Sequence, residues 1–215
     1  MAQWLNVDFL RNAHLFFNRD LMLPTSVFPD ISGIGWENVQ ASGIKGIIFD
    51  ADQTLVPYHG VMLHPGLVET FDKVKRVYGA DKIAILSNYA GNQMDDRRTK
   101  RKQALEANLG VRVISAAKKK PAPEPYHAAM AYLGTTPETT LMVGDRLATD
   151  ILGARRAGIQ RTFLVLNPID AHNDPWYTSL TRNFERKWYD KEIQIRWLGY
   201  LSGKWMQWGS HTGGI

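Results

Sequence analysis

The hydrophobic positions in the middle of the chain form short apolar, β-branched runs separated by longer amphipathic stretches. Short continuous apolar runs are typical of strands buried on both faces, whereas apolar residues at three- and four-residue steps indicate helices. The runs predict strands at Ile44–Asp50, Ile83–Ser87, Val111–Ser115, Thr140–Gly144 and Arg161–Leu166. The stretches between them predict helices at Gly66–Tyr78, Gln93–Asn108, Glu124–Leu133 and Leu147–Ala157.

Strands that alternate with helices predict an α/β fold, here a Rossmann-like, three-layer core with a mostly parallel sheet and helices on both faces. We expect this core to occupy residues 44–168. In such sheets, ligands bind beyond the carboxyl ends of the strands. Reactive side chains are therefore expected just after each strand.

The two ends of the chain depart from this alternation. Residues 1–43 predict an amphipathic helix followed by a Pro- and Gly-containing connector from Pro24 to Gly43. Residues 169–215 form an aromatic and basic tail that contains five of the seven tryptophans. Its apolar residues recur at three- and four-residue steps, as on an amphipathic helix: Phe184, Trp188, Ile195, Leu198, Leu201, Trp205 and Trp208.

Composition narrows the chemistry. The 215 residues include no cysteine, which excludes a thiolate nucleophile, a disulfide framework and cysteine-ligated metal sites. The net charge of +5 favours anionic partners, whether nucleic acid, phospholipid or a phosphate ester. Nine basic residues lie between Arg97 and Lys120, where a solvated helix face is the first interpretation and steering of a polyanion the second. No apolar run approaches the roughly 18 residues that a transmembrane helix needs.

Polar residues with catalytic potential gather at the expected strand ends. Three carboxylates would converge there with one lysine and a hydroxyl, and such a cluster needs a divalent cation to balance its charge. Hard oxygen ligands select Mg²⁺. The residues are Asp50, Asp52 and Thr54 after the first strand, Ser87 and Asn88 after the second, Lys120 ahead of Pro121, and Asp145 and Asp150 after the fourth.

Four segments carry a resemblance. GIIFDADQTL, ILSN, KKKP and MVGDRLATD resemble, in order, spacing and strand context, the four motifs of the haloacid dehalogenase (HAD) superfamily of phosphohydrolases. The resemblance implies that Asp50 attacks phosphorus to form an aspartyl-phosphate and that Asp52 serves as general acid and then base. It also implies a magnesium site made by Asp50, Asp145 and the backbone carbonyl of Asp52, with Asp150 supporting the metal from behind.

The same resemblance assigns the phosphate-binding residues. Lys120, Ser87 and the backbone amide near Asn88 would bind the phosphoryl oxygens, and Thr54 would orient the loop after Asp50. The second aspartate, Asp52, implies a phosphatase or phosphotransferase, not a dehalogenase. Only about thirty residues separate the first three motifs pairwise, too few for a cap domain, so the expected site is open and suits a large substrate.

Further segments resemble one branch, the phosphatidylglycerophosphate phosphatases of mitochondria and their bacterial relatives. They are NRDLMLPTSVFPDI, SNYAGNQMDDRRTKRKQALEANLGV and VGDRLATDILGARRAG. Ala51 and Gln53 depart from the Lys and Asn often found in this branch. The resemblance implies magnesium-dependent hydrolysis of phosphatidylglycerophosphate to phosphatidylglycerol, in the cardiolipin pathway. A phosphatase of nucleic-acid ends or phosphoproteins is the alternative, and a catalytically silent scaffold is a third hypothesis.

The resemblance also implies a place for the protein. It would be peripheral on the matrix side of the mitochondrial inner membrane, or on the cytoplasmic face of the membrane in a bacterium. The expected partner is a phospholipid substrate at an anionic membrane surface, with no transmembrane helix and no nucleic acid. The Trp-rich tail would contact lipid, or pack on the core or on another subunit, so a homo-oligomer through the terminal helices stays open.

Overall fold

The computed structural model describes residues 19–90, 96–167, 169–170 and 176–201. The chain divides into two compact units, Met1–Asp170 and Ala171–Ile215. The amphipathic helix expected near the N-terminus lies outside the described residues, as do Trp205 and Trp208 of the tail.

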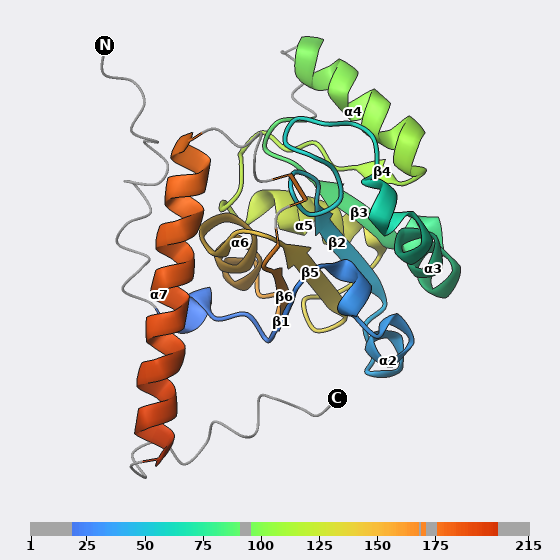
Figure 1. The fold of residues 1–215 in the computed structure, drawn as a ribbon. Coiled ribbons are helices and arrows are strands. Elements are labelled where there is room, and N and C mark those ends of the chain that lie inside the picture. The colour runs from blue at the N-terminus through green and yellow to red at the C-terminus, as the bar shows by residue number, and fades with distance from the viewer. Residues whose placement is uncertain (1–18, 91–95, 168, 171–175, 202–215) are drawn as a thin grey trace. The chain divides into compact units, whose positions relative to one another are not determined.

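Six parallel strands form the sheet of the first unit, in the order β1-β6-β5-β2-β3-β4 (Figure 1). This order places β2 at the centre of the sheet. It pairs with β3, the next strand along the chain, on one side and with β5 on the other. The strands are β1 (Ser26–Phe28), β2 (Gly46–Asp50), β3 (Ile83–Leu86), β4 (Arg112–Val113), β5 (Thr140–Gly144) and β6 (Arg161–Val165).

Helices connect the strands and cover both faces of the sheet. Alternate strand residues point to opposite faces, so Ile47 and Phe49 lie in one apolar cluster and Ile48 in another. The first cluster includes residues of α2 (Trp36–Ala41), α3 (Val68–Tyr78) and α4 (Asp96–Leu109). The second includes residues of α5 (Glu124–Leu133) and α6 (Leu152–Arg156), the latter preceded by a π-helical turn at Leu147–Ile151. The prediction of a three-layer α/β fold with a parallel sheet is confirmed.

The expected connector from Pro24 to Gly43 is wrong in two places, because it contains strand β1 and helix α2. Strand β1 pairs with β6 along Ser26–Phe28, and the backbone N–H of Thr25 donates to Thr162 O at 2.7 Å. The Trp36 ring of α2 is fully buried, 5.7 Å from the ring of Phe49. This segment therefore contributes to the sheet and to the core of the first unit.

Helix α7 (Trp176–Leu201) is the described part of the second unit. Leu180, Phe184 and Trp188 recur at four-residue steps and therefore lie along one side of the helix. Among the described residues, no helix has the length and apolar character needed to cross a membrane. Whether this side of α7 meets lipid or protein stays a prediction.

Candidate active site

The candidate site lies where the carboxyl ends of β2, β3 and β5 meet. Asp50 is the last residue of β2, Ser87 follows β3, and Asp145 follows β5. Strand β2 pairs in parallel with both neighbours, so the three strand ends share one edge. The chain runs from β2 to β3 on one side and returns through β5 on the other, which makes this edge the topological switch point of the sheet.

Three buried carboxylates form an acidic trio at this edge: Asp50, Asp145 and Asp150. One ligand atom from each lies within 4.8 Å of the others. The ammonium of Lys120, which is 5% exposed, donates to Asp50 Oδ1 and, at 2.7 Å, to Asp150 Oδ1. One lysine therefore bonds two members of a trio of carboxylates that could bind a metal ion.

The backbone fixes Asp150 in the trio. Asp150 lies in the π-helical turn, is 0% exposed, and accepts a hydrogen bond from the Arg146 N–H at 3.0 Å on Oδ2. A Cβ at Gly144, the last residue of β5, would come within 2.4 Å of the same Oδ2. Only glycine leaves room for the carboxylate there. Asp150 is thus a structural anchor of the trio as well as one of its charges.

Burial and repulsion change the pKa values in the trio. Burial raises the pKa of Asp50 well above its ordinary value; the Lys120 charge opposes this shift, and the other carboxylates add to it. Burial alone would lower the pKa of Lys120, but Asp150 and Asp50 together outweigh it and raise the pKa. The lysine therefore stays charged beside the two carboxylates. The clustered carboxylate oxygens of the trio are ligands of the kind that a divalent cation such as Mg²⁺ prefers.

The second aspartate of the first motif has a different neighbourhood, the Asp52–Arg101 pair. Arg101 of α4 donates to both carboxylate oxygens of Asp52, at 2.8 Å and 3.2 Å. The same guanidinium donates to Ser87 Oγ at 3.1 Å and to the Gly60 carbonyl at 3.0 Å. Asp52 also accepts from the Ser87 hydroxyl and, at 2.7 Å, from the His59 backbone N–H. The Asp52 carboxylate is therefore oriented towards the guanidinium of Arg101, which bonds both of its oxygens.

Arg101 is the functional candidate that sequence reasoning missed. It lies inside the basic run for which a solvated helix face is the first interpretation. That interpretation is wrong at Arg101, whose side chain is 9% exposed. Its spacing contained the signal, because Arg101 precedes the buried Leu105 and Leu109 by four and eight residues. Residues at such steps share one face of a helix, and this face of α4 points into the protein.

The expected phosphate-binding residues surround the same edge. Ser87 bonds Asp52 and Arg101, while the Asn88 side chain donates to the Lys120 carbonyl at 3.2 Å and accepts from its N–H at 2.8 Å. The Thr54 side chain is buried, and its hydroxyl has no hydrogen-bond partner among the described residues. The geometry brings Ser87, Asn88 and Lys120 together; their roles stay predictions.

Gln53, one of the two departures from the branch pattern, closes the loop that follows Asp50. Its backbone has φ of 63°, in the left-handed region. Its side-chain amide exchanges two hydrogen bonds of 2.8 Å with the backbone of Asp170. The Gln53 side chain bonds both the N–H and the C=O of Asp170. It therefore links the loop that follows β2 to the segment that follows β6.

The parallel sheet, the aspartates after its central strand and the lysine beside them define the protein as a member of the HAD superfamily. A family model described as mitochondrial PGP phosphatase matches residues 8–168, most of the chain. The chain belongs to that family.

Relatives in plants, algae and bacteria are similar along most of this chain. A protein of Arabidopsis thaliana named phosphatidylglycerophosphate phosphatase 1, chloroplastic/mitochondrial, is 32% identical over 181 residues, which cover 82% of this chain and 51% of the relative. Its Chlamydomonas reinhardtii counterpart, named chloroplastic, is 32% identical over 85% of this chain and 65% of its own length. The probable phosphatase YqeG of Bacillus subtilis is 32% identical over 79% of this chain and 90% of its own length. The chain thus spans about half of the Arabidopsis relative.

Proposed function

We propose that this protein is a magnesium-dependent phosphatase that removes the terminal phosphate of phosphatidylglycerophosphate and leaves phosphatidylglycerol. The family membership and the names of the relatives support the substrate. The observation that carries the chemistry is the pair of contrasting aspartates after β2. Asp50 lies in the acidic trio beside Lys120, and Asp52 lies outside it, paired with Arg101.

The two aspartates divide the reaction between them. A carboxylate oxygen of Asp50 attacks phosphorus in line, the bond from phosphorus to the ester oxygen breaks, and Asp52, which enters this step protonated, gives its proton to the leaving alkoxide. Asp52 then takes a proton from the water that attacks the aspartyl-phosphate at phosphorus. The bond from phosphorus to the Asp50 oxygen breaks, which releases inorganic phosphate and restores both carboxyl groups. Ser87 and Lys120, which contact Asp52 and Asp50, would hold the phosphoryl oxygens during both steps.

The residues of the trio fit Mg²⁺. Asp50 and Asp145, with the backbone carbonyl of Asp52, would hold the ion, and Asp150 would support the site through Lys120 and the Arg146 N–H. When bound, the ion neutralises negative charge on the phosphoryl group and the nucleophile.

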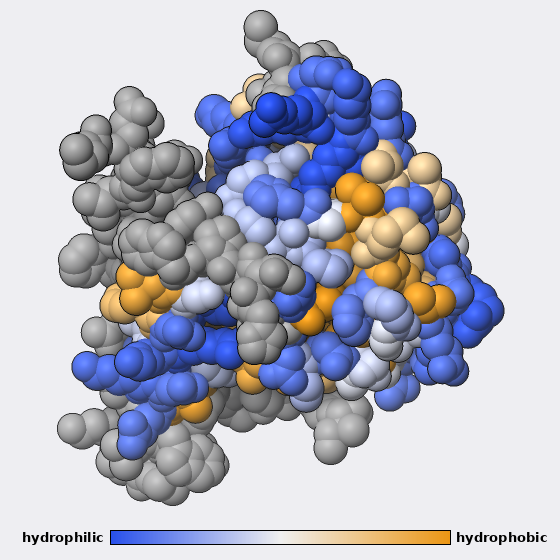
Figure 2. Space-filling view, turned by 45° about the horizontal axis from the view of Figure 1, so that its top comes forward, coloured by the Kyte–Doolittle hydropathy of each residue, from blue (hydrophilic) through white to orange (hydrophobic). Residues whose placement is uncertain are grey.

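We further propose that the substrate is met at an anionic membrane surface, in the mitochondrion on the matrix side or on the cytoplasmic face in a bacterium. Hydrophobic atoms are exposed among hydrophilic ones on the face shown in Figure 2. The exposed apolar side chains include Met62 and Val68, in and after the loop that follows Asp50, at 63% and 45% exposure. Together with the basic run, such residues suit a peripheral contact with anionic lipid.

One experiment tests the proposal and its alternatives. Phosphate release is measured from vesicles containing phosphatidylglycerophosphate, from a 3′-phosphorylated oligonucleotide and from a phosphopeptide, each with Mg²⁺ and with EDTA. We expect the lipid to be the best substrate, EDTA to abolish release, and Asp50→Asn to lower it by about a thousandfold or more. Asp72→Asn is the control, because Asp72 is an exposed aspartate of α3 that pairs with Lys75.

Two outcomes would contradict the proposal. Equal release by the wild-type protein and Asp50→Asn would refute the mechanism, because no other described residue is proposed as nucleophile. A preference for the oligonucleotide or the phosphopeptide would leave the mechanism intact and refute the lipid substrate.

A further inference from the structure

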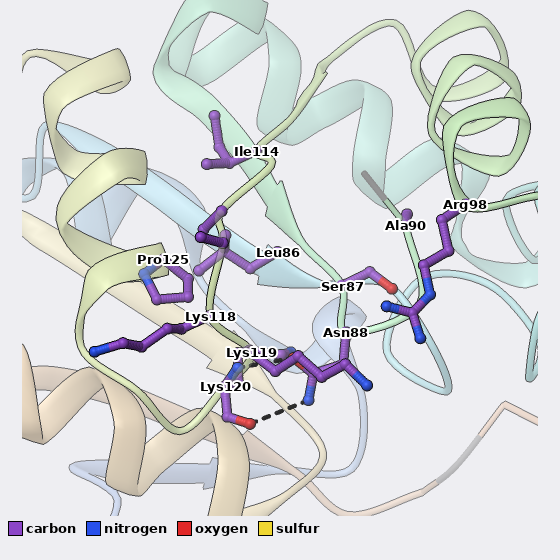
Figure 3. Close-up of a pocket in the computed structure, with 12 residues that line it drawn as sticks. Leu86, Ser87, Asn88, Ala90, Arg98, Ile114, Lys118, Lys119, Lys120 and Pro125 are labelled. Carbon is purple, nitrogen blue, oxygen red and sulfur yellow. Dashed lines mark hydrogen bonds between the residues drawn. The ribbon is translucent and has the colours of Figure 1, made fainter. Parts of the chain in front are cut away.

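A small basic pocket borders the candidate active site. Its volume is about 70 Å³, and Figure 3 shows its walls. Arg98 reaches it from α4, Lys118 and Lys119 come from the loop before α5, and Ser87 and Asn88 come from the end of β3. The lining therefore combines three segments that are distant in sequence.

The charge of the lining has one sign. Among the described residues that line it, every charged one is basic and none is aspartate or glutamate. Lys118 forms an ion pair with Glu124, which offsets part of its charge, whereas Lys119 is exposed. Leu86, Ile114 and Pro125 supply apolar wall beside these cations. A pocket with this lining favours a small anion, and the apolar wall strengthens the attraction by keeping water away from one side.

The pocket adjoins the reaction centre and shares Ser87, Asn88 and Lys120 with it. None of the trio lines the pocket, and neither does Asp52. Two hydrogen bonds between the Asn88 side chain and the Lys120 backbone fix these two lining residues against each other. The Lys120 ammonium bonds Asp50 and thus joins the pocket to the nucleophile's side of the site. An anion in the pocket would thus lie beside the phosphoryl group that Asp50 attacks, without reaching the nucleophile.

We infer that this pocket binds a second phosphate group of the substrate, a phosphodiester, through Arg98 and Lys119. The inference rests on the proposed function. Phosphatidylglycerophosphate carries a phosphomonoester and a phosphodiester on the two ends of one glycerol. With the monoester at Asp50, the diester is only a three-carbon bridge away, and an adjacent cationic pocket is where it would be bound. A substrate with one phosphate, such as phosphatidic acid, would leave the pocket empty.

The test compares two soluble substrates. Glycerophosphoglycerol phosphate has the monoester and the diester, whereas glycerol 3-phosphate has the monoester alone. We expect the Arg98→Gln/Lys119→Gln double variant to lower the ratio of the two kcat/KM values by about tenfold, a change in keeping with the loss of contacts from two solvent-screened cations. Lys100→Gln is the matched control, because Lys100 is an exposed α4 residue that pairs with Asp96 at 2.7 Å and does not line the pocket.

A binding measurement separates this inference from the proposed function. Titration calorimetry with glycerophosphoglycerol, which has the diester and no cleavable phosphate, needs no turnover. We expect its affinity to fall about tenfold in the double variant and to stay at the wild-type value in Lys100→Gln. Inorganic phosphate, titrated in parallel, identifies the source of the anion. An equal loss of affinity for inorganic phosphate would show that the pocket takes free phosphate, and would overturn the inference.

The failures are distinguishable. If the wild-type protein hydrolyses the lipid but the double variant keeps both the substrate ratio and the diester affinity, the pocket inference fails and the proposed function stands. If the wild-type protein hydrolyses neither substrate but binds the diester through Arg98 and Lys119, the proposed reaction fails and the pocket remains an anion site.

Discussion

The acidic trio and the Asp52–Arg101 pair involve aspartates two positions apart at the end of β2, yet their surroundings differ. In the trio, Lys120 bonds Asp50 and Asp150, and burial raises the pKa of Asp50 well above its ordinary value. Asp52 instead meets a guanidinium that bonds both of its oxygens, together with the Ser87 hydroxyl and the His59 N–H.

The difference explains why two similar residues can take different roles. The clustered carboxylates of the trio offer oxygen ligands to a cation, whereas both Asp52 oxygens already accept hydrogen bonds from Arg101. The backbone separates the two aspartates. Strand β2 ends at Asp50, and in the turn that follows, the Asp52 side chain bonds Arg101 of α4. Three experiments test whether this contrast governs stability, catalysis and metal binding.

The largest expected effect is on stability without metal. Lys120→Met removes the ammonium shared by Asp50 and Asp150 and leaves their buried charges uncompensated, so the free energy of unfolding in EDTA should fall by about 3–5 kcal/mol. Arg101→Met should lower it by only about 2 kcal/mol, because Asp52 keeps two hydrogen-bond donors. Urea unfolding monitored by circular dichroism measures both values.

Magnesium should restore part of the unfolding free energy lost in Lys120→Met and little of that lost in Arg101→Met. A bound cation replaces the charge that Lys120→Met removes, whereas the Asp52–Arg101 pair is not expected to bind one through its side chains. Equal losses for the two variants, both insensitive to Mg²⁺, would show that the trio and the pair do not differ in charge balance.

The next effect is on catalysis. If Arg101 is a positioning residue for Asp52, Arg101→Gln should lower kcat/KM for an alkyl phosphate by roughly 10–100-fold, because a displaced general acid protonates the leaving alkoxide poorly. An aryl phosphate, whose phenolate leaves without a proton, should lose much less. Arg101→Lys keeps the charge but not the forked geometry, so its kcat/KM for the alkyl phosphate should lie between those of the wild-type protein and Arg101→Gln.

The leaving-group comparison separates positioning from a general structural role. A variant that merely loosens the fold would lower both rates by the same factor. Equal losses on alkyl and aryl phosphates, with no recovery in Arg101→Lys, would therefore remove Arg101 from the mechanism and leave it as a packing residue of α4.

Most of the sheet could be predicted because its strands are buried on both faces. β5 (Thr140–Gly144) has the predicted bounds, and β2 begins two residues later than predicted, at Gly46. β1 escaped prediction because it has only three residues, lies between Pro24 and Pro29, and takes its stability from pairing with β6, far along the chain. A strand specified by a distant partner leaves little trace in the local pattern.

The candidate site shows the same division. The aspartates, Ser87, Asn88 and Lys120 follow strands or stand at a loop in recognisable motifs, so their convergence could be expected. Arg101 could not be distinguished by its type, because five of the six residues from Arg97 to Lys102 are basic. Only the packing of α4 decides which of them turns inward, and the spacing to Leu105 is the single local hint.

The smallest effect concerns the metal itself. Mg²⁺ at a hundred times its dissociation constant should stabilise the wild-type protein by about 2.7 kcal/mol. Asp145→Asn removes a member of the trio and should abolish most of this gain, whereas Asp52→Asn should keep it, because the Asp52 side chain is paired with Arg101 and only its backbone carbonyl is expected to face the ion. Thermal unfolding with Mg²⁺ and with EDTA measures the gain in each variant. If Asp52→Asn loses the gain as fully as Asp145→Asn, the Asp52 carboxylate must leave Arg101 to bind the metal, and the two aspartates would belong to one site.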